Sequence, residues 1–537
     1  MRLRFEHRRQ FIMAWSETRS RERVESHIAN IGDINVSDLA RGIDDLETVL
    51  SETECRNIVG AHIYADVSNF AALAADKTMS TDGYKRLIRS LHLYQREVTY
   101  IAENLFGAYR VHFQGSRAHV LAYRPVNDRD SSATNAALLM LVVDDFIKSV
   151  FNMEFSEYLD WRIAGGADVG EAIGTRNGKR GDRELLFIGD AANQAAKIMR
   201  GTASLVATPY LYSLLPDDLR ACCTKLADGN FKLSAAQATV DTLCDSYGIS
   251  WDRQKSTDRI STDRTALPLT EIEYSEANEL IELSRLGPTN SKRVHGASIF
   301  ADIAGFTAFV ASATTDEEKA KVLKVFHVIR KESAKVIEDD NTGIRVQYQG
   351  DRVQALFHMP KNDAKICNAA VEAAIGLQSS LEQVIKKVMP EAEPLTLAIG
   401  IDVGTTLVTR LGTRGDRDNV CLGVAVENAA RLEELSLGSE IAISSRVYDA
   451  LEVSLQRHFQ FDERRECYVA CGLTWEVIDL SEAASIYDDD GSVALKSVAV
   501  AAGIGAAIAG VAIAVKRASA EANPQVKPAR SYDPQPV

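Results

Sequence analysis

Short apolar runs alternate with longer amphipathic segments along most of the chain. Residues 298–301 and 344–348 are short apolar runs bounded by glycine, which is typical of buried strands. Residues 424–435 are rich in Ala, Glu and Leu and predict a helix. Strands alternating with helices predict an α/β fold in which helices cover a sheet. A further amphipathic helix is predicted over 315–337 from apolar residues at helical spacing, namely Val322, Val325, Phe326, Ile329 and Val336.

The pattern occurs twice. In each copy an apolar run ends at an aspartate, Asp66 in GAHIYADVSNF and Asp302 in GASIFADIAGF, and these two residues lie 236 positions apart. The spacing between later matching blocks falls only to 234 positions, so we interpret the chain as a tandem duplication. Each copy is predicted to be a βααββαββ unit, with a hairpin at Gly115-Ser116 and at Gly350-Asp351. The matching blocks are 60–70 with 296–306, 111–123 with 346–358, 164–174 with 398–408, and 180–198 with 414–432.

Segment boundaries follow from the repeat. We predict a helical extension over 1–57, a first domain over 58–239, a polar linker over 240–293 with a helix near 271–286, a second domain over 294–482, and a tail over 483–537. Within the tail, residues 498–515 are uninterrupted Ala, Gly, Val and Ile, a length that just suffices to span a bilayer. Lys and Arg lie beyond this run, which opposes the positive-inside rule. A membrane helix that tethers the protein and a packed Ala-rich helix both remain open.

Composition narrows the function classes. At 537 residues the chain is expected to hold at least two domains. The net charge of -14 argues against a nucleic-acid partner, because phosphate backbones bind basic surfaces. A nucleotide is still compatible with this charge, since divalent metals supply positive charge locally. The 8 cysteines form no CxxC pair, which indicates free thiols and a cytoplasmic location.

Candidate chemistry gathers in the second copy. Asp302 and Asp351 each lie at a predicted strand end beside a tight turn. Two carboxylates brought close together either repel each other or share cations, and oxygen ligands favour Mg²⁺ or Mn²⁺. The residues after Asp302 include Gly305, Phe306 and Thr307, which open a helix whose amides can bind phosphates. A helix cap and a turn residue are the structural alternatives for the two aspartates.

Taken together, FADIAGFT, QYQGDRVQALF, GIDVG and GVAVENAARLEE resemble the catalytic domain of class III adenylate and guanylate cyclases. The resemblance covers roughly 58–235 and 294–480. It implies two α+β, ferredoxin-like domains that pair within the chain about a pseudo-symmetry axis and convert a nucleoside triphosphate to a 3′,5′-cyclic nucleotide and pyrophosphate. It also implies that Asp302, the carbonyl of Ile303, and Asp351 bind two divalent cations. One cation would lower the pKa of the ribose 3′-hydroxyl and the other would neutralise the triphosphate.

The first copy differs at these metal positions. It keeps Asp66 but has Ser116 where the second copy has Asp351. It also has Asn193 and Lys197 where the resemblance places an Asn and an Arg that hold the ribose and the transition-state phosphate. Lysine keeps the charge of arginine but loses its two-pronged geometry. We therefore predict that the first copy contributes Asn193 and Lys197 and the second copy contributes the metals.

The second copy shows the reverse loss, with Glu427 in place of the Asn and Arg431 retained. An acidic Glu427 would repel a triphosphate. The pseudo-symmetric site built from Asp66, Ser116, Glu427 and Arg431 is accordingly predicted to be inactive or regulatory.

The base of the nucleotide substrate is the feature that the sequence constrains least. The family's base-reading positions are His112 and Leu186 here, which match neither the adenine nor the guanine pattern. A histidine on a strand is also commonly structural. We favour a pyrimidine substrate, UTP or CTP, as in the cyclases of Pycsar antiphage systems, with a downstream effector that senses the cyclic nucleotide. The alternatives are an adenylate cyclase with an unusual base pocket and a degenerate nucleotide-binding regulatory protein.

Overall fold

A computed structural model describes residues 15–42, 45–70, 80–156, 160–177, 184–199, 203–413 and 416–487. The chain divides into two compact units, Met1–Leu473 and Thr474–Val537. The described part of the second unit contains the helix α20 (Trp475–Tyr487). The apolar run at 498–515 lies outside the described residues, and none of the described helices is both long and apolar enough to cross a membrane.

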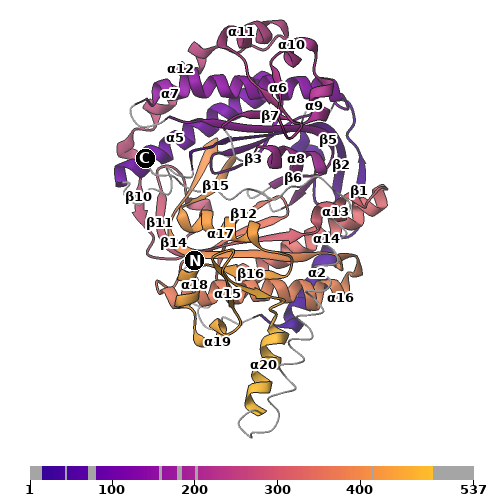
Figure 1. Ribbon diagram of the computed structural model, residues 1–537, viewed down its shortest axis with the longest axis vertical. Coiled ribbons are helices and arrows are strands. Elements are labelled where there is room, and N and C mark those ends of the chain that lie inside the picture. The colour runs from indigo at the N-terminus through magenta and orange to yellow at the C-terminus, as the bar shows by residue number, and fades with distance from the viewer. Residues whose placement is uncertain are drawn as a thin grey trace. The chain divides into compact units, whose positions relative to one another are not determined.

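The first unit contains two sheets built in the same way (Figure 1). The first half and the elements before it comprise α2 (Glu17–Ile31), β1 (Asn35–Asp38), α3 (Leu46–Val49), β2 (Glu54–Val67), α5 (Thr81–Tyr100), β3 (Tyr109–Gln114), β4 (Arg117–Ala122), α6 (Arg129–Phe146), α7 (Asn152–Glu154), β5 (Ile163–Asn177), β6 (Glu184–Ile188), α8 (Asp190–Ile198), β7 (Leu205–Ala207), α9 (Pro209–Leu214), α10 (Asp217–Arg220), β8 (Cys223–Lys225) and β9 (Phe231–Leu233). The connecting segment comprises α11 (Gln237–Ser246), α12 (Arg253–Ala266) and β10 (Tyr274–Glu276).

The second half comprises β11 (Ser291–Ala304), α13 (Phe306–Ala311), α14 (Asp316–Lys335), β12 (Ile344–Gln349), β13 (Arg352–Phe357), α15 (Asp363–Ser379), α16 (Lys386–Val388), β14 (Thr396–Thr413), β15 (Asp416–Leu422), α17 (Val424–Leu435), β16 (Glu440–Ile443), α18 (Ser445–Ala450), α19 (Val453–Gln456), β17 (Gln460–Asp462) and β18 (Cys467–Cys471).

Strand order is the same in both halves. The first sheet runs β3-β4-β2-β5-β7-β9-β8, with β1 on β2 and β6 on β5. The second runs β12-β13-β11-β14-β16-β18-β17, with β10 on β11 and β15 on β14. The predicted duplication and mixed α/β fold are therefore confirmed. The predicted helices over 315–337 and 424–435 and both Gly-centred hairpins are present as well.

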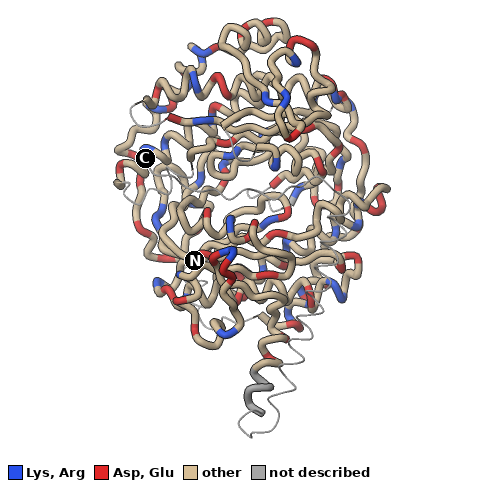
Figure 2. The backbone as a smooth tube through the Cα atoms, viewed as in Figure 1, with Lys and Arg blue, Asp and Glu red and all other residues tan. Residues whose placement is uncertain are grey.

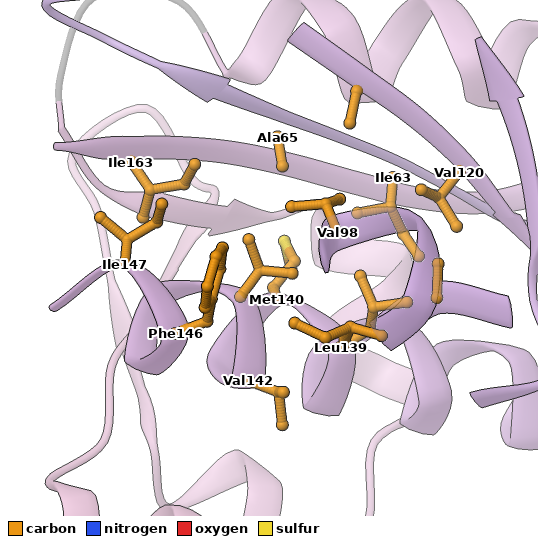
Figure 3. Packing of buried hydrophobic residues seen from close by; sticks show 14 of the residues in the cluster. Ile63, Ala65, Val98, Val120, Leu139, Met140, Val142, Phe146, Ile147 and Ile163 are labelled. Carbon is orange, nitrogen blue, oxygen red and sulfur yellow. The ribbon is translucent and has the colours of Figure 1, made fainter. Parts of the chain in front are cut away.

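Helices cover both faces of each sheet. In the first half α6 packs on β2 and β5 from one side and α8 packs on the same strands from the other. Figure 3 shows the apolar layer under α6, where Leu139, Met140 and Phe146 lie in one cluster with Ile63 and Val120 of the sheet. These side chains are almost completely buried, and burial of each stabilises the fold by about 1.5–3 kcal/mol. In the second half, α15 and α17 pack on β11 and β14.

The two halves share a core. The far end of β14 and the neighbouring β15 leave their own half, and Leu407, Leu411 and Val420 are buried in the core cluster of the first half. The main chain there is also held, because Gly412 N donates to His92 Nδ1 of α5 at 3.3 Å. Asp418 accepts a hydrogen bond from Arg110 Nη1 at 2.7 Å, and this contact links β15 to β3. The cleft between the halves is therefore fixed by buried contacts.

Two predicted segments were wrong in detail. The extension over 1–57 is not all helical, because residues 35–38 form β1, which pairs in parallel with the start of β2. The linker helix lies at 253–266, whereas 271–286 contains β10 and short 3₁₀ turns. The helix α12 has little amphipathic pattern and is held instead by polar contacts, including Arg259 Nη2 to the buried Glu97 Oε1 at 2.6 Å. Such contacts leave no hydrophobic periodicity to read.

Helix α2 is tied to the second half by a buried ion cluster. Arg23 Nη2 lies 2.5 Å from Glu332 Oε1, and Arg23 Nη1 lies 2.9 Å from Asp340 Oδ1. Glu332 is fully buried on α14, and Asp340 follows that helix at 2% exposure. Arg23 is thus shared by both carboxylates, and Asp340 has a second partner in Arg19 Nη2 at 2.9 Å.

We expect Arg23→Ala to lower the free energy of unfolding by about 3–5 kcal/mol, because it leaves the buried Glu332 without an arginine partner and leaves Asp340 with Arg19 alone. Arg21→Ala on the same helix is the matched control, since Arg21 pairs with Glu17 at the surface and its loss should cost less than about 1 kcal/mol. Thermal denaturation of the two variants measures the difference, and equal effects would contradict the ion cluster's role.

Candidate active site

Two half-buried aspartates lie at the same end of neighbouring strands in the second sheet. Asp302 is near the end of β11, and Asp351 is in the turn between β12 and β13, where Gly350 adopts a φ of 70°. Burial raises the pKa of Asp302. Burial, and then the charge of Asp302, raise the pKa of Asp351 well above its usual range. The two carboxylates are therefore close enough to repel each other, and an intervening cation would relieve that repulsion.

This donor set fits a hard divalent cation. Among the described residues neither Asp302 nor Asp351 forms an ion pair, so both carboxylates are available as ligands. No group of three or more His, Cys, Asp or Glu side chains suited to a metal occurs in the described part of the chain. A cation held by the two aspartates would take its other ligands from main-chain oxygens such as that of Ile303, from water or from phosphate, as Mg²⁺ commonly does.

A cavity of about 190 Å³ lies between the halves and opens onto Asp351. The first half contributes part of β5, the end of β6 and the start of α8, and the second half contributes α13, part of α14 and the turn at Gly350. Its lining residues are Glu171, Ala172, Ile173, Leu186, Phe187, Ile188, Gly189, Asp190, Asn193, Phe306, Thr307, Val310, Ala311, Ala313, Lys319, Gly350 and Asp351.

Asn193 crosses the cleft. Its Nδ2 donates to Thr307 Oγ1 at 2.9 Å, so an amide of the first half meets the first turn of α13 in the second half. Gly189 allows β6 to turn closely into α8, because a Cβ atom there would lie 2.6 Å from the carbonyl of Glu171. Lys197 lies one turn further along α8, is exposed, and does not line the cavity. Gly305, at φ 88°, caps α13.

The two expected base-reading residues lie in different surroundings. Leu186 lines the cavity. His112 instead belongs to a buried histidine row, in which its ring is 5.3 Å from that of His119 and His119 Nε2 is 3.0 Å from His62 Nδ1. Burial lowers the pKa of His112 to about 3, so the ring is neutral. The structure therefore brings Leu186, but not His112, into the lining.

Two charged lining residues that pair with each other were not foreseen. Lys319 Nζ on α14 donates to Glu171 Oε1 on β5 at 2.9 Å and to Asn57 Oδ1 at 2.9 Å, which closes one wall of the cavity across the halves. Lys319 lies in no repeated block, and Glu171 lies in one only as a strand residue. No spacing in the sequence indicated that they meet.

The pseudo-symmetric carboxylate in the first half is already satisfied. Asp66 accepts from Ser116 Oγ at 2.6 Å and from Arg117 Nε at 3.2 Å. The turn beside it is also covered, because a Cβ atom on Gly115 would lie 3.1 Å from Leu422, whereas one on Gly350 would have no neighbour within 4 Å.

In the second half, burial raises the pKa of Glu427 to about 7. Arg431 donates to Asn428 Oδ1 at 2.9 Å. The surroundings of Glu427 and Arg431 therefore differ from the open turn at Asp351.

Acidic and basic residues are interspersed in both halves (Figure 2). A duplicated α/β fold with a cavity between its halves, lined by Asn193 of one half and Asp351 of the other, is the arrangement expected of a pseudodimeric nucleotidyl cyclase.

Comparison with known proteins agrees with this class. Residues 291–478 match the adenylate and guanylate cyclase catalytic domain family. The chain is 30% identical over 500 residues to a uridylate cyclase of Pseudomonas aeruginosa, covering 90% of this chain and 93% of that protein. It is 27% identical over 431 residues to a uridylate cyclase of a Rhizobium species, covering 75% of this chain and 80% of that protein.

The crystal structure of a class III adenylyl cyclase-like ATP-binding protein from Pseudomonas aeruginosa has the same fold, with a TM-score of 0.75 at 26% identity. That similarity covers 87% of this chain and 99% of the other. The chain therefore belongs to the class III nucleotidyl cyclase family. It is a phosphorus–oxygen lyase that forms a cyclic nucleotide from a nucleoside triphosphate.

The contact between Asn193 and Thr307 can be tested directly. Thr307→Val keeps the side-chain shape but removes the hydroxyl that holds the amide, and we expect kcat to fall by up to about tenfold, the equivalent of one hydrogen bond. Thr307→Ser keeps the hydroxyl and should stay close to wild type. Steady-state kinetics of both variants measure the effect, and identical kcat values would exclude a role for this hydrogen bond.

Proposed function

We propose that this cyclase converts UTP to its 3′,5′-cyclic monophosphate and pyrophosphate. The observation that carries the proposal is the 30% identity to a uridylate cyclase over 90% of this chain. Leu186 in the cavity supports it, since an aliphatic side chain offers no hydrogen bond to a base edge at a position where purine-selective members of the family carry a polar residue.

Asp302, Asp351 and the main-chain carbonyl of Ile303 would hold two divalent cations, Mg²⁺ or Mn²⁺. When bound, these ions would place positive charge on the triphosphate and make the ribose 3′-hydroxyl more acidic. The two carboxylates and the main chain supply only oxygen ligands, which is the ligand type that these cations prefer. The close approach of Asp302 and Asp351 supports this role, because each carboxylate destabilises the ionised form of the other until a cation is bound.

The remaining groups position the nucleotide. Asn193 would hold the ribose from the first half, at the point where its amide already meets Thr307. The amides of Gly305, Phe306 and Thr307 would bind phosphate oxygens. Lys197, exposed one turn along α8, would extend to the phosphate chain as a point charge.

With the ribose and triphosphate so oriented, the 3′-oxygen attacks the α-phosphorus in line and pyrophosphate leaves. Orientation and charge stabilisation supply most of the catalysis in reactions of this type. The residues named above therefore act mainly by fixing the nucleotide in that geometry.

We further propose that the product is a second messenger in antiviral defence, made in the cytoplasm and detected by a separate effector protein. Membrane association through residues 498–515 stays a hypothesis.

ATP is the second candidate substrate, because one structure that is similar over 87% of this chain is described as ATP-binding. Incubation with Mn²⁺ and each of the four ribonucleoside triphosphates, followed by mass identification of products, separates the candidates. We expect cyclic UMP as the main product. Cyclic CMP would move the substrate to the other pyrimidine, cyclic AMP would favour the adenylate cyclase alternative, and no product would favour a regulatory nucleotide-binding protein.

The site assignment makes an asymmetric prediction. Asp302→Ala or Asp351→Ala should reduce cyclic nucleotide formation by on the order of 10³-fold or more, since several kcal/mol of charge stabilisation depends on these ligands. Asp66→Ala should leave activity close to wild type, because Asp66 is engaged by Ser116 and Arg117. Turnover at saturating Mn²⁺ is the measurement. Loss of activity in Asp66→Ala with retention in Asp351→Ala would reverse the assignment.

A further inference from the structure

A cationic side chain lies directly beside the carboxylate pair. Arg352 follows Asp351 in the chain and begins β13, with its guanidinium carbon 4.8 Å from the centroid of the Phe300 ring. Its Nη1 donates to Glu433 Oε2 at 3.0 Å, and its Nη2 donates to Gln349 Oε1. Arg352 is near enough to act on Asp302 electrostatically, yet no ion pair between Arg352 and Asp302 or Asp351 is found among the described residues.

The first half shows the other possible arrangement. Arg117 begins β4 as Arg352 begins β13, and each follows the same turn. Arg117 Nε, however, binds Asp66 Oδ2 at 3.2 Å, and Asp66 is the counterpart of Asp302. The same type of side chain at the same place therefore occupies the carboxylate in one half and leaves it open in the other. A guanidinium on such a carboxylate competes with a metal ion, because both bind the same oxygen atoms.

The difference follows from the groups that hold the arginine. Glu433 lies on α17 where α17 crosses Gly400, and a Cβ atom on Gly400 would be 2.2 Å from Glu433 N. In the first half the corresponding crossing is at Gly166, where a Cβ atom would be 3.0 Å from Met199 N. Methionine has no charge to offer an arginine, so the first half lacks this partner.

The second partner is also missing from the first half. Gln114, the counterpart of Gln349, lies 2.9 Å from His112 Nε2 through its Nε2. The hydrogen bond that Gln349 makes to Arg352 thus has no equivalent at Arg117. With neither partner in place, Arg117 contacts Asp66.

We propose that Glu433 and Gln349 are positioning residues that hold the Arg352 guanidinium away from Asp302, so that Asp302 and Asp351 stay free to bind cations. The first half lacks counterparts of these two contacts, so Arg117 binds Asp66 where a metal cation would otherwise bind. The proposal rests on the proposed function in one respect, namely that Asp302 and Asp351 are the metal ligands.

Metal affinity tests the proposal without relying on turnover. Mn²⁺ binding to the full chain is measured from the electron paramagnetic resonance signal of free Mn²⁺, at saturating 3′-deoxy-UTP, which lacks the attacking hydroxyl. Glu433→Met, which installs the residue of the first half, should weaken Mn²⁺ binding roughly tenfold or more as Arg352 moves onto Asp302. Adding Arg352→Ala to Glu433→Met should restore binding.

A neighbouring residue provides the control for charge alone. Glu434 follows Glu433 on α17 and also acts electrostatically on Asp302, so Glu434→Met removes a similar charge without freeing Arg352. We expect it to weaken Mn²⁺ binding much less than Glu433→Met. Equal effects of the two variants, or a double variant no better than Glu433→Met, would overturn the proposal.

The experiment also distinguishes failure of the metal assignment from failure of the positioning role, and it allows for a variant that does not fold. If the wild-type protein binds Mn²⁺ no better than Asp351→Asn, the metal assignment itself fails, which is distinct from normal binding in Glu433→Met. If Glu433→Met does not fold, Gln349→Leu is measured in its place. Weaker binding that Arg352→Ala rescues supports the proposal, and unchanged binding overturns it.

Discussion

The burial of β14 and β15 in the opposite half is the contact on which the active site depends. Leu407, Leu411 and Val420 leave water only if the two halves stay together, so separating the halves would expose apolar surface and break the contact between Arg110 and Asp418. Because the halves are held so firmly, Asn193 on one and Asp351 on the other can line a single small cavity. Precise placement across a domain boundary requires such a rigid support.

Duplication supplied two copies of one fold, and the chemistry of the copies then diverged. In the second half the turn at Gly350 is open, and Asp302 and Asp351 form no ion pair among the described residues. In the first half the equivalent turn is covered by Leu422, and Asp66 is satisfied by a hydroxyl and a guanidinium. The energetic logic is the same in both places, because a half-buried carboxylate must be neutralised. The halves differ in whether the protein itself provides the neutralising group.

Much of the fold could be predicted from the sequence because the duplication repeats the same motif spacing in both halves. The strands, the two hairpins and the helices over 315–337 and 424–435 have strong periodicity or fixed turn residues. Helix α12 was missed because its stability comes from contacts such as Arg259 with Glu97, which do not create an apolar stripe. The roles assigned to Asn193, Lys197, Asp302 and Asp351 stay predictions.

The finer electrostatics of the site could not be predicted, because they depend on side-chain direction. His112 and Leu186 looked equivalent as base-reading positions, yet only Leu186 lines the cavity. Arg352 lies in the motif QYQGDRVQALF and Glu433 lies in GVAVENAARLEE. Nothing in their spacing of 81 positions indicated that their side chains form a contact. The pairing of Lys319 with Glu171 depends in the same way on how α14 lies against β5.

Joining both halves in one polypeptide through a common core also changes how output relates to abundance. Enzymes that assemble this kind of cleft from two separate identical chains lose it on dilution and form it in proportion to the square of their concentration when scarce. Here the covalent link makes assembly of the cleft unimolecular. Each copy of the protein carries one complete cleft, so synthesis capacity scales linearly with the number of molecules even when a cell holds very few.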